Sequence, residues 1–286
     1  MNTIDLAYRK YILQILREGA PQEDRTGTGT IATFGTVLEH DCSNGLAQIQ
    51  VRSVSPRIAF EELMWMLRGQ VDVKFLQDKN IKIWDGNTTR EALDKYGKQH
   101  IAENTIGKGY SYQFRNFGGV DQLKNVIEGI KVNPLSRRHY INLWNPAELV
   151  DMALEPCHLG YNFVFANDKL HLMQYKRSDD AVLGQPTNIM FANMFLGLVC
   201  AYTGLEMGKI KTVSANSHIY VNHVNAVHKM LAVDSLELQN CPRIDWKINK
   251  NINSFDDLLS VEWDDIEITK PKSILKFTRE DLPMAV

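Results

Sequence analysis

The chain has 286 residues, of which 44% are hydrophobic and 23% are charged, and its formal net charge is −2. This length and composition favour one folded domain with a substantial core and exclude extended disorder. The low net charge argues against a general nucleic-acid binder, which usually carries a basic stripe, so an anion site has to come from locally placed arginines.

The four cysteines are widely spaced and form no CxxC pair. We therefore expect neither a zinc site nor a disulfide framework, and the cysteine usage favours a reducing cytoplasm. Residues 1–5 lack the basic start and apolar run of a signal peptide. The longest apolar stretch, 189–202, is interrupted by Asn193 and is too short to cross a membrane, so no membrane contact is expected.

Apolar spacing predicts several helices and two strands in the N-terminal half. The helices are expected at 8–16, 60–67, 74–77, 88–96 and 120–130, and the strands at 30–38 and 47–54. Residues 24–30 hold two glycines, three threonines and Arg25. They predict a polar turn, whose backbone amides can also approach an anion. Tyr110 follows the glycine-rich loop 107–109. The loop either presents Tyr110 to a site, or Tyr110 is an ordinary half-buried tyrosine.

The C-terminal half predicts a β-hairpin, a buried helix and several shorter elements. Strands 158–165 and 169–176 flank the turn Asn167-Asp168, which places Cys157 and Arg177-Ser178 at the same end. The central buried helix should span 189–203, starting after Pro186. The other predictions are strands at 139–144, 209–213, 244–246, 266–268 and 274–277, and helices at 145–149 and 221–231. We find no repeats or linkers and predict a single domain, 1–286.

Cys157 is the candidate nucleophile. It follows a proline and precedes a histidine, with two arginines upstream and Arg177 downstream, so a thiolate attack on a phosphorylated substrate is indicated. Glu62 lies between apolar residues; it is either solvent-exposed or buried with a raised pKa that suits proton transfer near neutral pH. Asn188 either caps the buried helix or binds a ligand through one donor and one acceptor.

Taken together, these motifs resemble the thymidylate synthase family along nearly the whole chain. They occur in the family's order: Asp24 to Thr30, Glu62-Leu63 with Trp65, Ile83-Trp84-Asp85 with Asn87, Arg137-Arg138, Trp144-Asn145, Met152-Ala153-Leu154 with Pro156-Cys157-His158, Arg177-Ser178 with Asp180, Leu183-Gly184 with Pro186 and Asn188-Ile189, His218 with Tyr220 and Asn222-His223, and Met284-Ala285-Val286.

The resemblance implies an α/β (α+β) fold with a large, twisted mixed sheet packed by helices around a central buried helix. It also implies a homodimer whose subunits pack sheet to sheet. Arg137 and Arg138 would reach across the interface to the phosphate of the partner's substrate. Arg25, Arg177 and Ser178 would hold the same phosphate from within the subunit, because guanidinium groups suit a phosphate dianion.

The implied reaction is reductive methylation of dUMP to dTMP, with 5,10-methylenetetrahydrofolate as carbon and hydride donor and no metal. Cys157 would add to C6 of uracil and turn the ring into an enolate, and nearby arginines would favour its thiolate. Asn188 would bind the amide edge of uracil and reject cytosine. His218 and Tyr220 would hold the ribose 3′-hydroxyl.

The resemblance assigns further residues to proton transfer and to the folate. Glu62 would move protons through water, His158 and Asp180 would belong to the catalytic network, and Tyr110 would assist removal of the C5 proton. The folate side would be formed by Trp84, Asn87, Leu154, Asp180, Leu183 and Gly184, by Arg52 at the glutamate tail, and by the closing C-terminal residues Ala285 and Val286. No nucleic acid is required.

Several positions depart from the family's pattern and leave two alternatives open. Arg52 stands where a lysine is usual, Thr187 replaces a phenylalanine, and the loop before Tyr110 is altered. A dUMP 5-hydroxymethylase shares the thiolate and folate steps but captures the methylene group with water. Trp84, Leu154 and the Met-Ala-Val terminus favour methylation. The other alternative is a nucleotide- or RNA-binding protein, against which the retained catalytic residues argue.

Overall fold

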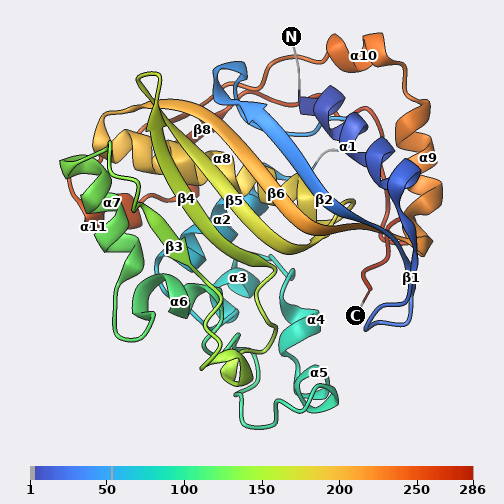
Figure 1. Cartoon of the computed structure of the whole chain (residues 1–286), viewed down its shortest axis with the longest axis horizontal. Helices are drawn as coiled ribbons and strands as arrows, with labels where there is room; N and C mark the ends of the chain where they lie inside the picture. The colour runs from blue at the N-terminus through green and yellow to red at the C-terminus, as the bar shows by residue number, and fades with distance from the viewer. Residues whose placement is uncertain (1–3, 53, 286) are drawn as a thin grey trace.

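A computed structural model describes residues 4–52 and 54–285 (Figure 1). Its main feature is a six-stranded mixed sheet with the strand order β1-β2-β6-β5-β4-β3, and two short strands, β7 and β8, pair separately. The strands are β1 (Ala20–Gln22), β2 (Thr30–Asp41), β3 (Tyr140–Asn142), β4 (His158–Ala166), β5 (Lys169–Asp180), β6 (Glu206–Tyr220), β7 (Trp246–Ile248) and β8 (Ile266–Ile268).

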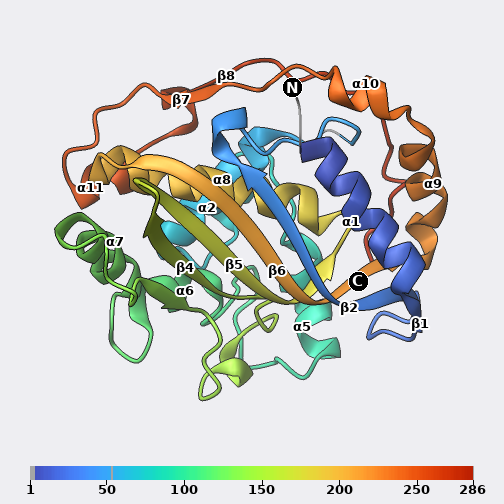
Figure 2. The same ribbon diagram turned by 45° about the horizontal axis from the view of Figure 1, so that its top comes forward.

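The helices of the described chain lie around this sheet. They are α1 (Ile4–Glu18), α2 (Pro56–Leu67), α3 (Lys74–Asp78), α4 (Asp85–Thr88), α5 (Arg90–Lys95), α6 (Tyr110–Asn116), α7 (Gln122–Val132), α8 (Gly184–Thr203), α9 (Val224–Ala232), α10 (Ser235–Gln239) and α11 (Phe255–Leu259), with short 3-10 turns at Cys42–Asn44, Leu149–Asp151, Val221–His223 and Trp263–Asp265. Figure 2 shows α9 and α10 running along the edge next to α1. This mixed architecture confirms the predicted fold class.

The hairpin β4–β5 confirms its prediction and fixes the registers used below. Asn167 and Asp168 both adopt positive φ, 51° and 58°, as a two-residue hairpin turn requires. The strands are antiparallel, whereas β5 pairs in parallel with β6. A parallel neighbour needs a crossover, which α8 provides. α8 therefore leaves the sheet from the end of β5 at which the hairpin opens.

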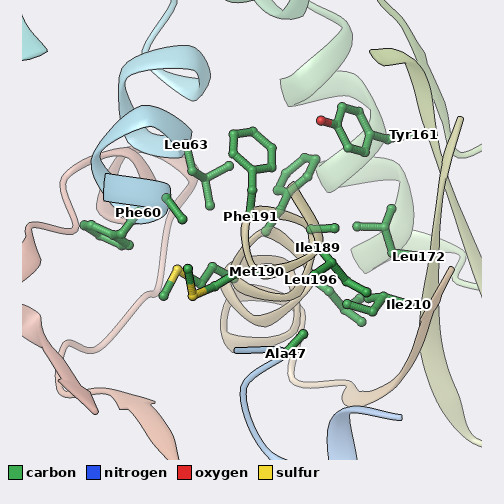
Figure 3. Packing of buried hydrophobic residues seen from close by; sticks show 14 of the residues in the cluster. Ala47, Phe60, Leu63, Tyr161, Leu172, Ile189, Met190, Phe191, Leu196 and Ile210 are labelled. Carbon is green, nitrogen blue, oxygen red and sulfur yellow. The ribbon is translucent and has the colours of Figure 1, made fainter. Parts of the chain in front are cut away.

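Helix α8 is the centre of the core. Its mid-section is buried on all sides and it ends at Gly204, which adopts the left-handed conformation with φ 76°. In Figure 3, Phe60 and Leu63 of α2 and Leu172 and Ile210 of the sheet pack against it from opposite sides. No helix in the described ranges has the length and apolarity needed to span a membrane.

The other face of the sheet carries exposed apolar side chains. Phe34 is 88% exposed and Val37 53% on β2, and Val164 of β4 and Tyr140 of β3 are also exposed. Gly35, with φ 73°, interrupts the alternation of β2 between the first two of these residues. Figure 1 shows no helix across the middle strands on this face. The contiguous apolar surface is typical of an interface.

Residues 47–52 and 54 form no strand, contrary to the sequence prediction, and residue 53 of that predicted segment lies outside the described residues. Backbone amides of this segment are bound by buried side chains instead: Asn193 of α8 accepts from Ala47 N at 2.7 Å, and Asp5 of α1 accepts from Gln50 N at 2.8 Å and Val51 N at 2.7 Å. The apolar side chains of residues 47–51 are buried although their backbone forms no strand pairing. A run of apolar residues in the sequence does not distinguish a buried strand from a buried irregular segment.

Other boundaries also differ from the sequence predictions. The helix expected at 145–149 is absent, and a 3-10 turn occurs at Leu149–Asp151 instead. Residues 274–277 form only a single bridge, from Leu275 to Arg52. α8 begins at Gly184, so Pro186 lies in its first turn rather than before it. A proline is tolerated there because the first amides of a helix have no intrahelical acceptor.

Asn193 gives a direct stability prediction. Replacing Asn193 with Ala leaves the buried Ala47 N–H without its acceptor, and we expect the free energy of unfolding to fall by about 2–3 kcal/mol. Urea unfolding followed by circular dichroism measures this change. Asn251→Ala, at an exposed position, is the matched control and should change the stability little. Equal stability of the two variants would contradict the proposed role.

Candidate active site

Arg177 clamps the loop that carries Cys157. Its backbone N–H donates to Cys157 O at 2.9 Å, its Nε donates to Pro156 O at 2.9 Å, and its Nη2 donates to Glu155 O at 2.9 Å. The sequence prediction that the hairpin brings Cys157 and Arg177 to one end is therefore confirmed. The clamp fixes the backbone on both sides of the cysteine.

Tyr110 contacts Cys157 directly, so it is not an ordinary half-buried tyrosine. It is buried at the first position of α6, and its hydroxyl accepts from Cys157 N at 2.6 Å and from His158 N at 3.3 Å. The hydroxyl also bonds the Cys157 thiol. Burial, with the Cys157 charge, raises the pKa of Tyr110 well above its usual value. Tyr110 thus keeps its proton and can donate it.

Burial dominates the ionisation of Cys157. It raises the pKa of the thiol, while Arg177 and then Lys176 lower it and Asp179 raises it. Arg177 therefore favours the thiolate, as the sequence analysis expects, but burial outweighs it and the net pKa of the thiol is raised. The cations reduce the desolvation cost of the thiolate without cancelling it.

His158 is a neutral, buried member of a polar cluster. Its Nδ1 lies 2.8 Å from Tyr161 Oη and 3.4 Å from Gln174 Nε2, and the side chain of Asn188 also bonds it. Burial, and then the charge of Lys176, lowers the pKa of His158 well below its usual value. No hydrogen bond or ion pair among the described residues joins it to Glu62.

Asn188 does not cap α8, because it is the fifth residue of the helix and the cap position, Leu183, has no side-chain cap bond. Gly184 lies beside it: a Cβ added to Gly184 would stand 3.5 Å from Asn188 Nδ2 and 3.5 Å from Asp180 Cβ. Asp180 Oδ1 accepts from Val182 N at 2.9 Å and Leu183 N at 3.0 Å, which orders the entry to α8. These residues form one side of the site.

Glu62 and Trp84 are joined directly. Trp84 Nε1 donates to Glu62 Oε1 at 3.0 Å, and burial raises the pKa of Glu62 to about 7 despite this bond. A carboxyl group with this pKa exchanges protons near neutrality. The Trp84 ring lies 5.9 Å from that of Tyr110, which lies 5.6 Å from that of His158, so an aromatic row connects Glu62 with the nucleophile. Asn87 N donates to Trp84 O at 3.0 Å.

The polar turn 24–29 is held by Asp24. Its carboxylate accepts from Thr26 N at 2.8 Å and from Gly29 N at 2.7 Å. Burial alone would raise the pKa of Asp24, but the bonds from Thr26 and Gly29 lower it. Arg25 is exposed and its guanidinium lies 4.4 Å from the ring centre of Tyr96. The turn thus presents the exposed guanidinium of Arg25 from a backbone that Asp24 holds by hydrogen bonds.

The predicted ribose residues are neighbours at the end of β6. The rings of His218 and Tyr220 lie 5.1 Å apart, and His218 Nδ1 lies 3.1 Å from Asn216 Oδ1. Burial and then Asp180 raise the pKa of Tyr220 to about 12. Ser178 is the register partner of Asn216 on β5. The predicted phosphate and ribose residues therefore lie on adjacent strands.

Within one chain, no hydrogen bond or ion pair among the described residues joins Arg137 or Arg138 to Cys157. Both are exposed just before β3, and neither has an acidic partner among the ion pairs of the described ranges.

Leu183 also lines a cavity of about 470 Å³. The residues that line it with Leu183 include Arg52, Lys276 and Arg279. Arg52 Nε and Nη1 are buried and have no hydrogen-bond partner in the part of the chain that the structure describes. Leu154 is partly buried against the core and Ala285 is partly exposed. Val286 lies outside the described residues.

Comparison with known proteins identifies the family. The sequence profile of thymidylate synthase matches residues 6–278. The chain belongs to the thymidylate synthase family. It is 35% identical over 278 residues to the thymidylate synthase of Mycoplasma mobile, covering 91% of this chain and 94% of that protein. It is 35% identical over 281 residues to the enzyme of Varicella-zoster virus, covering 93% and 90% of the two chains.

The chain also matches bifunctional dihydrofolate reductase-thymidylate synthases. That of Paramecium tetraurelia is 40% identical over 237 residues, covering 78% of this chain and 51% of the relative, so the chain spans about half of that protein's length. Membership of the family confirms the sequence prediction and supports methylation of dUMP to dTMP with methylenetetrahydrofolate as co-substrate. None of these relatives is named a hydroxymethylase, and the alternative has no support.

The sequence did not point to the buried polar residues beneath the site. Lys176 and Asp179 form an ion pair inside the core, and Tyr161 and Gln174 surround His158. The sequence does contain a clue to the burial of Lys176. In the alternating pattern of the strand it shares a face with Leu170, Leu172 and Gln174, and this is the core face.

The pKa of Glu62 predicts how stability depends on pH. The folded pKa of about 7 exceeds the usual 4.5, so the contribution of this group is fully present below the lower value and is lost as the pH rises through the higher one. Glu62→Gln should therefore be more stable than the wild type at about pH 8, by up to about 3 kcal/mol, and equally stable near about pH 4.5.

Urea unfolding at a series of pH values measures this difference. Glu91→Gln, at an exposed position of α5, is the control and should track the wild type throughout. Wild-type and Glu62→Gln stabilities that change in parallel over the whole range would contradict a raised pKa.

Proposed function

We propose that this chain catalyses the reductive methylation of dUMP to dTMP with Cys157 as the nucleophile. The observation that carries the assignment is the arrangement at this cysteine: Arg177 clamps its loop, and the hydroxyl of Tyr110 bonds both its backbone and its thiol. A fixed thiol beside a cation and a proton donor suits addition to C6 of uracil.

The phosphate of dUMP is proposed to bind at the open end of the hairpin. Arg177 and Ser178 of β5 and Arg25 of the polar turn would hold it, with His218 and Tyr220 at the ribose. Asn188 projects from the first turns of α8 toward His158, where its amide would meet the N3–O4 edge of uracil. Cytosine presents the reverse donor pattern and would leave buried groups unpaired.

Proton transfer is assigned to Glu62 and Tyr110. Glu62 has a pKa of about 7 and would exchange protons with the ring through water. Tyr110 remains protonated at the thiol and would take part in removal of the C5 proton. His158 is neutral and would orient Asn188, and Asp180 would hold the loop between substrate and co-substrate.

The co-substrate is proposed to lie along Trp84, Asn87, Leu154, Leu183 and Gly184. Methylenetetrahydrofolate supplies the one-carbon unit and the hydride when bound. Arg52 Nε and Nη1, which have no hydrogen-bond partner among the described residues, and the cavity that Arg52 lines with Lys276 and Arg279 suit the anionic glutamate tail. Ala285 and Val286 would close over the site and exclude water.

We propose a homodimer built on the uncovered face of the sheet. The exposed apolar residues of β2, β3 and β4 support this interface, as do Arg137 and Arg138, which lack acidic partners in the described chain and would complete the partner's phosphate site. The chain would act as a single catalytic domain. The cytoplasmic location remains a prediction from the cysteine usage.

Loss of the Cys157 thiol should abolish turnover. Cys157→Ala removes the group that adds to C6, so we expect a loss of at least about 10³-fold in kcat. Spectrophotometric detection of dihydrofolate from dUMP and methylenetetrahydrofolate measures it. Cys200→Ala, at a buried cysteine of α8, is the control and should retain activity. Normal turnover by Cys157→Ala would refute the nucleophile.

Sharing of arginines between subunits can be tested by complementation. Cys157→Ala and the double variant Arg137→Ala/Arg138→Ala should each be inactive. A mixture refolded together should recover up to about a quarter of wild-type activity, because half of the dimers contain one complete site. If both arginines serve their own subunit, no mixture regains activity.

A further inference from the structure

Lys176 and Asp179 form a buried ion pair at the end of β5. Their side chains are 1% and 0% exposed. Lys176 Nζ bonds Asp179 Oδ1 and donates to Gln185 Oε1 at 2.9 Å. Asp179 Oδ2 also accepts from Tyr11 Oη at 2.7 Å and from Ser214 Oγ at 3.1 Å. Four elements, α1, β5, β6 and α8, thus meet at two charges that are costly to bury.

This pair lies next to His158, the residue that directly follows the candidate nucleophile. Lys176 is the register partner of His158 across β4 and β5, and both side chains are buried. Directly opposite residues of an antiparallel pair point to the same face. The next residue along, Arg177, donates its N–H to Cys157 O. On α8, Gln185 holds Lys176 and Asn188 holds His158, one turn apart.

We propose that Lys176 is a positioning residue for Cys157: its buried ammonium group, fixed by Asp179 and Gln185, stabilises the Cys157 thiolate. The proposal rests on the proposed role of Cys157 as the nucleophile. Charges act more strongly in a dry interior than in water. In agreement, Lys176 lowers the pKa of Cys157 by more than Asp179 raises it, and Lys176 also lowers the pKa of His158.

Other charged or titratable groups face Cys157 from each neighbouring element. They are Arg177 on β5, Tyr110 on α6, His158 on β4 and Tyr220 at the end of β6, while Tyr11, His218 and Asp180 face the ion pair. These side chains are the same in every Lys176 variant, and Lys176→Arg also keeps the charge that lowers the pKa of His158 and His218. The difference between variants at Lys176 therefore isolates the effect of its charge.

The experiment is the pH dependence of Cys157 alkylation by iodoacetamide in the substrate-free full chain, followed by peptide mass spectrometry. The other cysteines are buried and serve as internal references. We expect Lys176→Gln to raise the midpoint by about one pH unit, so that alkylation below it is about tenfold slower. Lys176→Arg, which keeps the charge, should stay near the wild type. Lys169→Gln, at the far end of the same strand, should not shift it.

Lys176→Gln leaves Asp179 buried without its cation, so a second variant protects the test against misfolding. Lys176→Gln/Asp179→Asn removes both charges and should have a midpoint above the wild type but below that of Lys176→Gln. Wild-type midpoints in both variants would overturn the proposal. So would a Lys176→Arg midpoint as high as that of Lys176→Gln, because the charge would then not be responsible.

Alkylation requires neither dUMP nor folate, so its outcome is independent of the turnover assay. Unchanged midpoints together with an inactive Cys157→Ala would refute only the role of Lys176. Shifted midpoints together with an active Cys157→Ala would leave the coupling intact and refute the proposed function.

Discussion

The register of β4 against β5 is the constraint on which the site depends. The two-residue turn at Asn167 and Asp168 permits one pairing of the strands. In that pairing Arg177 meets the backbone of Cys157 and Lys176 stands opposite His158. A slip of one residue would turn these side chains to the other face of the sheet. The hairpin turn, far from the chemistry, therefore decides which groups surround the cysteine.

Dehydration and charge oppose each other throughout this region. Burial raises the pKa of Cys157, Glu62 and Tyr110 and lowers that of His158. Without compensation these groups would all be neutral. The cations beside the thiol favour its ionised form, while Glu62 receives, among the described residues, only the hydrogen bond from Trp84. Burial thus gives Glu62 a pKa that suits proton exchange, whereas ionisation of Cys157 depends on its cationic neighbours.

Much of the fold could be predicted from the sequence because local patterns were strong. The hairpin, α8 and its Gly204 terminus follow from turn chemistry and apolar periodicity. The conformation of residues 47–52 could not be predicted, because Asp5 and Asn193, distant in sequence, bind amides of this segment. The start of α8 was misplaced because the sequence rule for proline did not allow for the first turn of a helix.

For the site, too, the residues in local motifs could be predicted and those that meet only through the fold could not. Cys157, Arg177 and Tyr110 stood in short motifs, and the structure brings them into contact. The roles that the resemblance implies for them remain predictions. The polar groups beneath them gave no motif, since a lysine and an aspartate in a strand are usually solvated. Their pairing depends on α1, β6 and α8 meeting at one point, which no local pattern encodes.

The hydroxyl of Tyr110 has a consequence for local stability. It is the acceptor for the backbone amides of both Cys157 and His158, and it is carried by α6, a helix of seven residues. Separation of α6 from β4 would leave both amides without this acceptor, while the bonds from Arg177 to the loop and the sheet itself would remain. Such subglobal openings need less free energy than global unfolding. The acceptor that holds the nucleophile's backbone amides in this chain therefore depends on the docking of one short helix against β4.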